Sequence, residues 1–407
     1  MATGDNDLAR HFALDPAVTF LNHGSFGACP RVVLDAQTAL RERMEREPVQ
    51  FFHRDYEPLL DEARAALGAL LGARPEDLAF VPNASTAVNT VLRGIDLAAG
   101  DELIATDHSY GACRNAIEEV ARRAGARVVL VNIPFPGTTA DGVVEAVLAR
   151  VTPRTRLAML DHVTSPTALV FPLERLVPLL RERGVDTLVD GAHAPGMVPL
   201  DLDRLGAAYY TGNCHKWLCT PKGAAFLHVR RDLQGRLRPL VISHGATTPR
   251  SDRSRFLIEF DWTGTDDPTA HMAIPAAIRF LEGAMPGGIP GLRARNHALA
   301  VEARRILCDA LGLAPPCPDE LLGAIASVPL PDSPAGDPPA RSRITPIDPI
   351  QDALFARHAI EVPVHPWPAP PRRLLRISAQ MYNCAAHYER LAAALVELLG
   401  PAAGARP

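Results

Sequence analysis

Residues 186–222 hold the side chains best suited to covalent chemistry. A strand-like run ends in Asp190, and 26 residues later Lys216 follows His215 directly. Among the 42 basic residues of this 407-residue chain, only Lys216 and Lys222 are lysines. Arginine replaces lysine in most surface roles but cannot form an imine, because its nitrogens stay protonated and delocalised. One of the two lysines is therefore a candidate for imine chemistry, although two lysines can also survive by chance in so arginine-rich a chain.

Asp190 and Lys216 are predicted to meet at one edge of a sheet. An Asp at the end of a parallel strand points into the crevice where such sheets bind ligands. A pyridoxal phosphate site needs a lysine that forms an imine with the cofactor and a carboxylate that keeps the pyridine nitrogen protonated. The spacing therefore predicts pyridoxal 5'-phosphate as the cofactor, with Lys216 and Asp190 as catalytic residues. The alternative is that Asp190 is only a turn residue at a strand end.

The elements that must position these residues alternate along the first half of the chain. Helices are expected at 34–47, 58–71, 84–94, 110–124, 139–150 and 173–183, and strands at 78–81, 102–106, 127–132, 156–161 and 186–190. Helices alternating with apolar strands are typical of a mainly parallel sheet that is covered on both faces. The predicted fold class is therefore α/β.

A second, smaller domain is expected to follow. Helical stretches at 269–285 and 292–311 flank the breaker Pro-Gly-Gly-Ile-Pro-Gly. We expect an N-terminal arm at 1–20, a large cofactor-binding domain at 21–270 and a smaller C-terminal α+β domain at 271–407. Residues 331–342 are rich in Pro, Gly, Asp and Ser and are expected to form an exposed loop.

Composition and charge exclude several classes of protein. The net charge of -4 supplies no general attraction for nucleic acid or an anionic membrane. No apolar stretch could span a bilayer, and the N-terminus lacks the features of a signal peptide, so we expect a cytoplasmic protein with small-molecule partners. The seven cysteines are scattered without a Cys-x-x-Cys pair, and His-Glu-x-x-His is absent. We therefore expect neither a disulfide framework nor a metal site.

Six motifs resemble one known family. They are FLNHGSFGACP at 20–30, NASTAVN at 83–89, DHVTSPTALV at 161–170, VDGAHAPG at 189–196, GNCHKW at 212–217 and RISAQMYN at 376–383. In this order they resemble the class V branch of the fold type I pyridoxal-phosphate enzymes, which contains cysteine desulfurases, some aminotransferases and isopenicillin N epimerase. The resemblance covers nearly the whole chain and is closest to isopenicillin N epimerase-like proteins. It implies the fold type I architecture.

The resemblance also implies roles around the cofactor ring. It makes Lys216 the imine-forming lysine and Asp190 the partner of the pyridine nitrogen. It places His193 and Ser165 near the phenolic oxygen, although a serine before proline can also be a simple turn residue. The residue that stacks on the ring is expected in the loop DHSYGA. We prefer Tyr110 and keep His108 as the rival, and Tyr110 could also serve packing alone.

The cofactor phosphate is expected at a helix N-terminus, where free N–H groups and the helix dipole favour an anion. Asn83 begins such a segment, and Ser85 and Thr86 add two hydroxyl groups. An ordinary helix cap would look the same in the sequence.

The resemblance supplies three further phosphate contacts. His215 matches a histidine that contacts the phosphate, and Asn213 stands where many relatives carry serine. Thr265 matches a threonine that reaches the phosphate of the neighbouring subunit. The resemblance therefore implies a homodimer with shared active sites.

Arg376 matches the arginine that binds the α-carboxylate of the substrate, a task that suits its planar fork. An amino-acid-like substrate follows from this match. Asn22 and His23, in the N-terminal loop, are expected to line the substrate side, although the glycines around them could mean only a tight turn.

The fate of the carbanion left by removal of the Cα proton decides the reaction. Return of the proton to the opposite face gives epimerisation, return to the cofactor gives transamination, and loss of a β-substituent gives a lyase. Cysteine desulfurases carry a mobile thiol before the carboxylate-binding arginine, but residues 357–373 contain no cysteine and offer His365 and Trp367 as substrate contacts or packing groups. We therefore expect an epimerase-like enzyme, with a β-eliminating carbon-sulfur lyase as the first alternative and an aminotransferase as the second. A non-catalytic pyridoxal-phosphate sensor is the remote alternative.

Overall fold

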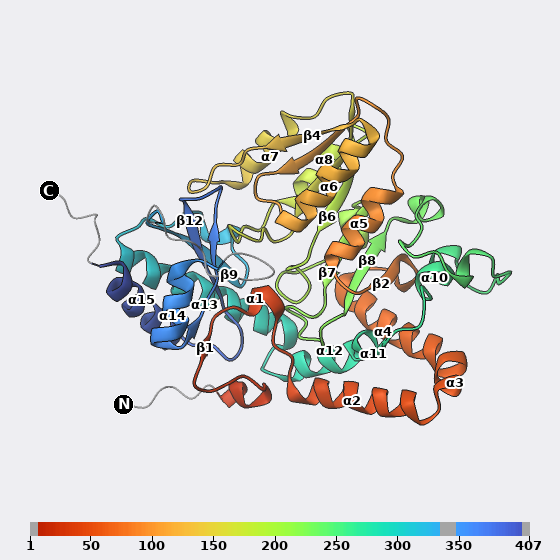
Figure 1. The fold of residues 1–407 in the computed structure, drawn as a ribbon, viewed down its shortest axis with the longest axis horizontal. Coiled ribbons are helices and arrows are strands. Elements are labelled where there is room, and N and C mark those ends of the chain that lie inside the picture. The colour runs from red at the N-terminus through yellow and green to blue at the C-terminus, as the bar shows by residue number, and fades with distance from the viewer. Residues whose placement is uncertain (1–6, 334–346, 401–407) are drawn as a thin grey trace.

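The computed structural model describes residues 7–333 and 347–400 (Figure 1). Two sheets organise these residues: a seven-stranded sheet in the larger part and a three-stranded antiparallel sheet in the smaller part. Most of the segment 331–342, expected to be a loop, lies outside the described residues.

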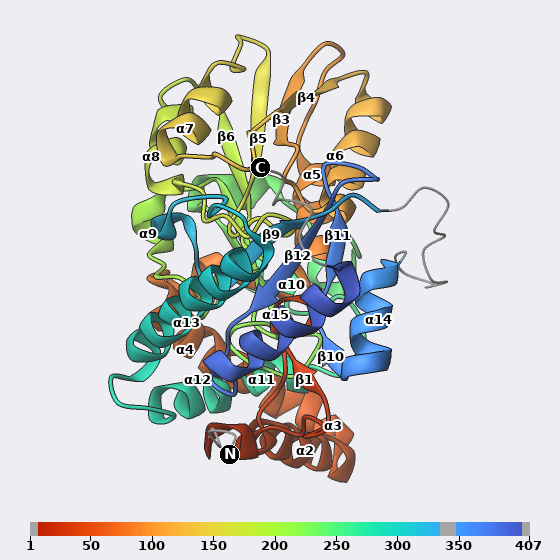
Figure 2. The ribbon, with the colours of Figure 1, turned by 90° about the vertical axis from the view of Figure 1, so that its left-hand side faces the viewer.

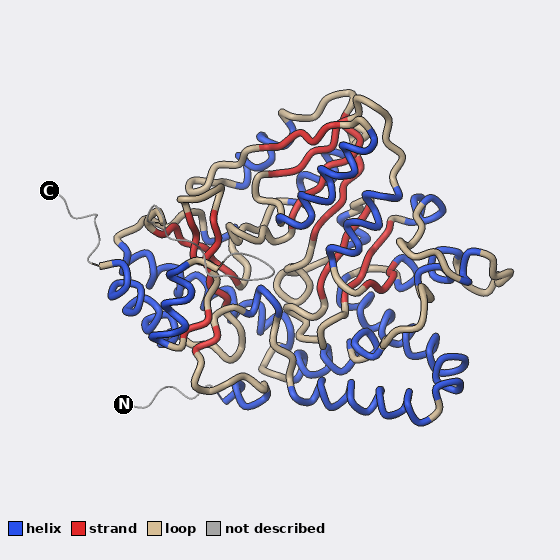
Figure 3. Tube along the Cα trace, viewed as in Figure 1, coloured by secondary structure: helices blue, strands red, loops and turns tan. Residues whose placement is uncertain are grey.

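The large sheet has the strand order β2-β8-β7-β6-β5-β3-β4 (Figure 3). Its strands are β2 (Leu78–Val81), β3 (Glu102–Thr106), β4 (Arg127–Val131), β5 (Thr155–Asp161), β6 (Asp186–Asp190), β7 (Tyr209–Asn213) and β8 (Ala225–Val229). Five neighbouring strands are parallel, and β8 runs antiparallel to both of its neighbours. The predicted, mainly parallel sheet of the α/β class is therefore confirmed.

Helices cover both faces of this sheet because its strands are apolar on both sides. One face packs against α5 (Ala84–Gly94), α6 (Gly111–Ala124) and α10 (Arg255–Phe260). The other packs against α4 (Tyr56–Leu71), α7 (Ala140–Leu148) and α8 (Leu173–Arg181). Neighbouring residues of one strand enter different cores: Leu103 packs with the first set and Ile104 with the second. This alternation fixes the register of each strand between the two helical layers.

The smaller part is built on the sheet β11-β12-β9 (Figure 2). Its strands are β9 (Ile325–Leu330), β11 (Val364–Pro366) and β12 (Arg373–Ser378). Helices α13 (Gly288–Leu311) and α15 (Ala385–Leu399) pack against each other, and α13 also contacts β9 and β12. Helix α14 (Pro349–His358) leads into β10 (Ile360–Glu361), which pairs with β1 (Thr19–Phe20) and so ties the N-terminal segment to this part.

The helix expected at 269–285 is interrupted. The structure has α11 (Thr269–Met272), then Ala273, then α12 (Ile274–Gly283) with a proline in its first turn. Proline lacks the N–H that a continuous helix would need there, so the helix restarts. Both α11 and α12 contact α2 (Arg31–Arg46) and α4. The expected boundary at residue 270 thus falls inside a group of packed helices, and the division into 1–20, 21–270 and 271–407 stays a prediction.

No helix in the described part of the chain combines the length and apolar character that a membrane crossing requires.

Candidate active site

Lys216 lies at the carboxyl end of the large sheet, just after β7. Its side chain is partly buried, and its Nζ lies 3.1 Å from Nε2 of His193. The indole N–H of Trp217 points at Nδ1 of the same imidazole from 3.5 Å. An Nδ1 that accepts from Trp217 leaves the histidine proton on Nε2, where it can be donated to an uncharged Lys216.

The environment of Lys216 favours its uncharged form. Burial, followed by the charge of Arg376, lowers the pKa of Lys216 to about 7, while Asp190 acts in the opposite direction. Burial also lowers the pKa of His193 well below its ordinary value, with Lys216 and Arg376 adding to the effect. At neutral pH a large fraction of the lysine is therefore an amine that can attack an aldehyde.

Asp190 ends β6 as one of two neighbouring carboxylates. Its Oδ1 accepts from the backbone N–H of Ala192 at 3.1 Å, and its Oδ2 accepts from the thiol of Cys113 at 3.0 Å. Asp161 occupies the paired position on β5. Burial and the charge of Asp190 raise the pKa of Asp161 well above its ordinary value. The raised pKa favours the protonated, uncharged form of Asp161.

One cavity of about 170 Å³ collects most of the predicted cofactor residues. Eight of them line it, namely Ser85, Tyr110, Ser165, Asp190, His193, Asn213, His215 and Lys216. They come from segments far apart along the chain, and the parallel sheet gathers them at one edge. The cavity also receives Ser25, Phe26 and Asp161, which the sequence did not single out as site residues.

The N-terminus of α5 forms one end of this cavity. Asn83 caps the helix by accepting from the N–H of Thr86 at 2.8 Å, and Asn213 accepts from the N–H of Ala84 at 2.9 Å. Within the described residues, the backbone N–H and the hydroxyl of Ser85 donate to no protein acceptor. Nδ1 of His215 is 2.9 Å from the carbonyl of Ala224, which leaves Nε2 for other contacts. Free donors at a helix N-terminus fit a phosphate.

The remaining ends of the cavity fit the rest of the cofactor. Asp190 offers a buried carboxylate for a protonated ring nitrogen, and Lys216 offers a buried, uncharged amine for the aldehyde. A site with an anion-binding end, a carboxylate and a neutral lysine matches the chemical groups of pyridoxal 5'-phosphate.

Tyr110 and His108 have different positions. Tyr110 lines the cavity, and its backbone N–H donates to Asp161 at 3.2 Å. The imidazole of His108 is fully buried elsewhere, with Nδ1 2.6 Å from the hydroxyl of Thr167 and Nε2 2.8 Å from the carbonyl of Ile133. Of the two residues proposed for ring stacking, only Tyr110 reaches the cavity.

Arg376 lies behind the cavity and contacts two serines that line it. Its Nη1 donates to the carbonyl and hydroxyl oxygens of Ser165 at 2.7 and 3.1 Å, and its Nη2 donates to the hydroxyl of Ser25 at 3.1 Å. Its Nε is buried and has no hydrogen-bond partner in the described chain. Burial lowers the pKa of Arg376 to about 10, which still leaves the guanidinium charged at neutral pH.

The two loop residues expected on the substrate side do not line the cavity. The amide of Asn22 donates to Glu361 at 3.1 Å. His23 is fully buried, with its two ring nitrogens 2.7 Å from the hydroxyl of Tyr382 and 3.0 Å from the carbonyl of Lys216. Both residues brace the loop, and Ser25 and Phe26 reach the cavity in their place.

Two predicted phosphate contacts also lie away from this cavity. Thr86 directs its hydroxyl to Asn83 at 3.0 Å and lines a second cavity of about 160 Å³, together with Thr263 and Asp266. Thr265 is exposed. Thr265 does not line the cofactor cavity, so its contact with the phosphate of another subunit stays a prediction.

One group of side chains outside these cavities has the spacing of metal ligands. Ligand atoms of Asp77, Asp203 and His228 lie within 4.8 Å of one another. Both oxygens of Asp77 already accept hydrogen bonds, from Arg74 on one side and from Arg231 and Gln234 on the other. Because two arginines neutralise this carboxylate, we assign no metal to the group.

The site residues that the sequence analysis missed differ in how readily the sequence could have revealed them. Asp161 ends a predicted strand beside the strand of Asp190, so its place at the same edge could have been inferred. Ser25 belongs to a motif already noted. Cys113 gave no signal, because its contact with Asp190 joins residues 77 positions apart.

Comparisons with known proteins show the family of the chain. The model of the family "Aminotransferase class-V" matches residues 22–311. Isopenicillin N epimerase of Amycolatopsis lactamdurans is 41% identical over 412 residues, which cover 98% of this chain and 99% of that protein. L-cysteine desulfhydrase of Arabidopsis thaliana is 29% identical over 428 residues, 97% of this chain and 90% of that protein.

Solved structures show the same fold. A variant of the enzyme C-DES with glycine covalently linked to its PLP cofactor matches with a TM-score of 0.80 and 22% identity, covering 96% of this chain and 99% of that one. The cysteine desulfurase CsdA from Escherichia coli matches with a TM-score of 0.77 and 21% identity, covering 98% and 99%. The chain belongs to the class V aminotransferase family with the fold type I architecture. It is an enzyme of that family, and its cofactor is pyridoxal 5'-phosphate.

Proposed function

We propose that this enzyme epimerises an amino acid or an amino-acid-derived compound at Cα, as an isopenicillin N epimerase-like enzyme. The observation that carries the proposal is the 41% identity with isopenicillin N epimerase over nearly the whole of both chains. The cavity supports it, because Lys216 lines it and Arg376, a candidate carboxylate ligand, contacts two serines that line it.

The roles of the residues follow from their positions. The α-carboxylate of the substrate binds to Arg376, which Ser25 and Ser165 hold in place. When bound, the cofactor supplies a ring that accepts electrons from Cα. Lys216 Nζ takes the Cα proton, and a solvent proton returns to the opposite face of Cα. Before this step the Nε2–H of His193, 3.1 Å away, donates to the uncharged amine. Asp190 would hold the proton of the ring nitrogen, and Tyr110 would contact the cofactor from the cavity wall.

Incubation with isopenicillin N in deuterium oxide tests the reaction. We expect the diastereomer with one deuterium at Cα, detected by chromatography and mass spectrometry, and no reaction with Lys216→Arg. A keto acid as the main product would indicate transamination instead and would overturn the proposal.

Attachment of the cofactor is tested separately. Reduction with borohydride should fix the cofactor onto Lys216. The amine of Lys222 donates to the carbonyl of Gly27 at 2.6 Å and does not line the cavity, so it should stay unlabelled. A label on Lys222 in a peptide map would refute the assignment.

A β-eliminating carbon-sulfur lyase is the second candidate function, because L-cysteine desulfhydrases are also among the relatives. Cys113 is the cysteine that contacts Asp190. The state of its thiol disfavours desulfuration through a protein thiol. Burial and the neighbouring Asp190 raise the pKa of this thiol well above its ordinary value, so it is a poor nucleophile. Release of sulfide and pyruvate from L-cysteine, at a rate above that of epimerisation, would favour the lyase.

We further propose a cytoplasmic homodimer with shared active sites. The position of Thr265 supports this, since its side chain is exposed and does not line the cofactor cavity of its own chain. Exposed apolar side chains at Leu240, Val241 and Ile242 lie in the same region, because Leu240 and Val241 line the cavity that also holds Thr263 and Asp266.

A further inference from the structure

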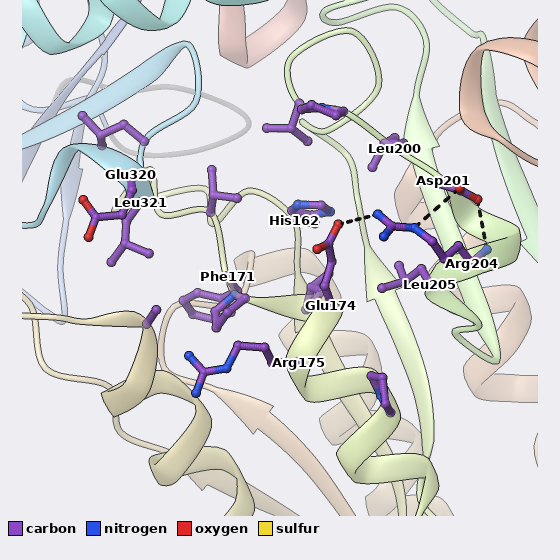
Figure 4. Close-up of a pocket in the computed structure, with 18 residues that line it drawn as sticks. His162, Phe171, Glu174, Arg175, Leu200, Asp201, Arg204, Leu205, Glu320 and Leu321 are labelled. Atoms are coloured by element: carbon purple, nitrogen blue, oxygen red, sulfur yellow. Dashed lines mark hydrogen bonds and ion pairs between the residues drawn. The ribbon is translucent and has the colours of Figure 1, made fainter.

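Another cavity is larger than the cofactor cavity. It has a volume of about 610 Å³, which is in the usual range for small-molecule sites. It lies at the seam between the two parts of the molecule, where the backbone N–H of Val170 donates to the carbonyl of Leu321 at 2.8 Å (Figure 4). We call it the seam cavity. Its walls come from α8, from the segment 198–205 and from residues 320–322.

His162 is the polar group that points into the seam cavity (Figure 4). Its side chain is only 8% exposed, and its Nδ1 lies 3.0 Å from the hydroxyl of Tyr210. That hydroxyl is fully buried and has no other partner among the described residues, so it must donate to Nδ1. The imidazole proton then resides on Nε2, for which the described chain provides no acceptor. This N–H group faces the seam cavity and has no acceptor among the described residues, so a ligand oxygen there would meet an available donor.

The other lining groups define the rest of the ligand. Phe171, Leu200 and Leu321 are among several apolar side chains that form the walls. Arg204 pairs with Glu174 at 3.1 Å, and Arg175 pairs with Asp141 at 2.8 Å, so neither arginine is free for an anion. Asp201 lies 3.6 Å from the same Arg204, and Glu320 adds another carboxylate, so acidic groups outnumber basic groups in the lining and would repel an anion.

The two cavities share a wall. Asp161 and Val163 line the cofactor cavity, whereas His162, between them, lines the seam cavity. The backbone N–H of His162 also donates to the carbonyl of Asp190 at 2.8 Å. A ligand on His162 would therefore sit next to the strand ends that carry the catalytic carboxylate.

We propose that the seam cavity binds an uncharged, mainly apolar organic molecule whose carbonyl oxygen accepts a hydrogen bond from His162. The carbonyl requirement follows from the single unpartnered N–H, and the lack of charge follows from the paired arginines and the surplus carboxylates. This site is separate from the cofactor cavity and does not depend on which reaction the enzyme catalyses.

Fluorine NMR on the cofactor-loaded enzyme tests the proposal with three probes. They are 4-fluoroacetanilide, which has an amide carbonyl, 1-ethyl-4-fluorobenzene, which lacks it, and 4-fluorophenylacetate, which is charged. We expect saturable binding of the amide with a Kd below about 1 mM, and binding about tenfold weaker for the other two. An excess of an amino acid should not displace the amide. Equal affinity for all three probes, or displacement by the amino acid, would overturn the proposal.

Two variants locate the probe. Leu200→Trp should fill the cavity and abolish binding, whereas Leu313→Trp, at an exposed leucine after α13, should leave it unchanged. His162→Phe should weaken only the amide and remove its advantage over the ethyl compound. Unchanged binding by Leu200→Trp would refute the location, and this result does not depend on how well His162→Phe folds.

Discussion

The reactivity expected of Lys216 comes from the surroundings of its amine. Burial and Arg376 lower its pKa to about 7, so in the cofactor-free protein the amine is charged below this pH and neutral above it. Only the neutral amine attacks an aldehyde. Asp190 and Cys113 act in the opposite direction, but the removal of water from the amine has the largest effect on the pKa.

The rate of cofactor uptake should therefore depend on pH. We expect the rate at which cofactor-free enzyme takes up pyridoxal 5'-phosphate to rise by roughly tenfold between pH 6 and pH 8 and then to level off. Stopped-flow absorbance measures this rate. Lys222→Arg is the control and should show the same profile. A midpoint near pH 10 would show that burial does not lower the pKa of Lys216.

Arg376 should determine the preference for substrates with an α-carboxylate. Loss of a buried, charge-assisted contact typically costs about 2 to 5 kcal/mol, so Arg376→Ala should bind amino acids far more weakly. Arg376→Lys keeps the charge but loses the planar fork and should restore binding only in part.

The comparison of an amino acid with its decarboxylated amine measures this preference. Wild type should prefer the acid strongly, and Arg376→Ala should not. If the variant still discriminated, Arg372 or Arg373 would be the carboxylate ligand. The structure makes Arg373 a poor substitute, because its guanidinium pairs with Asp348 at 2.8 Å.

Among the elements, the short helix α1 (His23–Phe26) brings the N-terminal loop into contact with the segment that carries Lys216. It ends at Gly27, which has a positive φ of 69°. A Cβ there would collide with the carbonyl oxygen of His215. The loop can therefore pack on the backbone of the lysine segment only because this residue lacks a side chain.

Gly27→Ala should lower both the melting temperature and the affinity for the cofactor. Gly100→Ala is a matched control, because Gly100 has a positive φ of 87° but open space around it. The backbone strain alone should cost about 1 to 2 kcal/mol in both variants. The additional loss in Gly27→Ala should come from the collision and should appear in a cofactor titration. If both variants lost the same melting temperature and cofactor affinity, the close approach of Gly27 to the backbone of His215 would have no role.

For the whole molecule, the proposed dimer predicts which apolar surface is covered. Val241→Asp should produce a monomer with weak cofactor binding, because it places a charge in the proposed interface. Val396→Asp, at a similarly exposed valine on α15, should remain dimeric. Light scattering gives the masses. A fully active monomer, or dissociation caused by Val396→Asp instead, would contradict the arrangement.

The family and the cofactor could be predicted from motifs and spacing in the sequence, whereas the catalytic roles of Lys216 and Asp190 stay predictions. Lys216 and Asp190 stand out because imine chemistry demands particular side chains at strand ends, and strand ends follow from local apolar patterns. Strands β2, β3 and β6 begin and end where the pattern predicts. The phosphate-binding end of the site was predictable for the same reason, since a helix N-terminus is a local feature.

Which side chains meet depends on the packing of distant segments. Ser25 contacts Arg376 although 351 positions separate them. Tyr110 reaches the cavity and His108 does not, because the turn after β3 directs their side chains to different sides. Local sequence patterns report on neighbours along the chain, whereas these contacts arise when the large sheet, the N-terminal loop and the small sheet pack together. The same packing created the seam cavity and buried Lys216, and burial is the main cause that lowers its pKa to about 7.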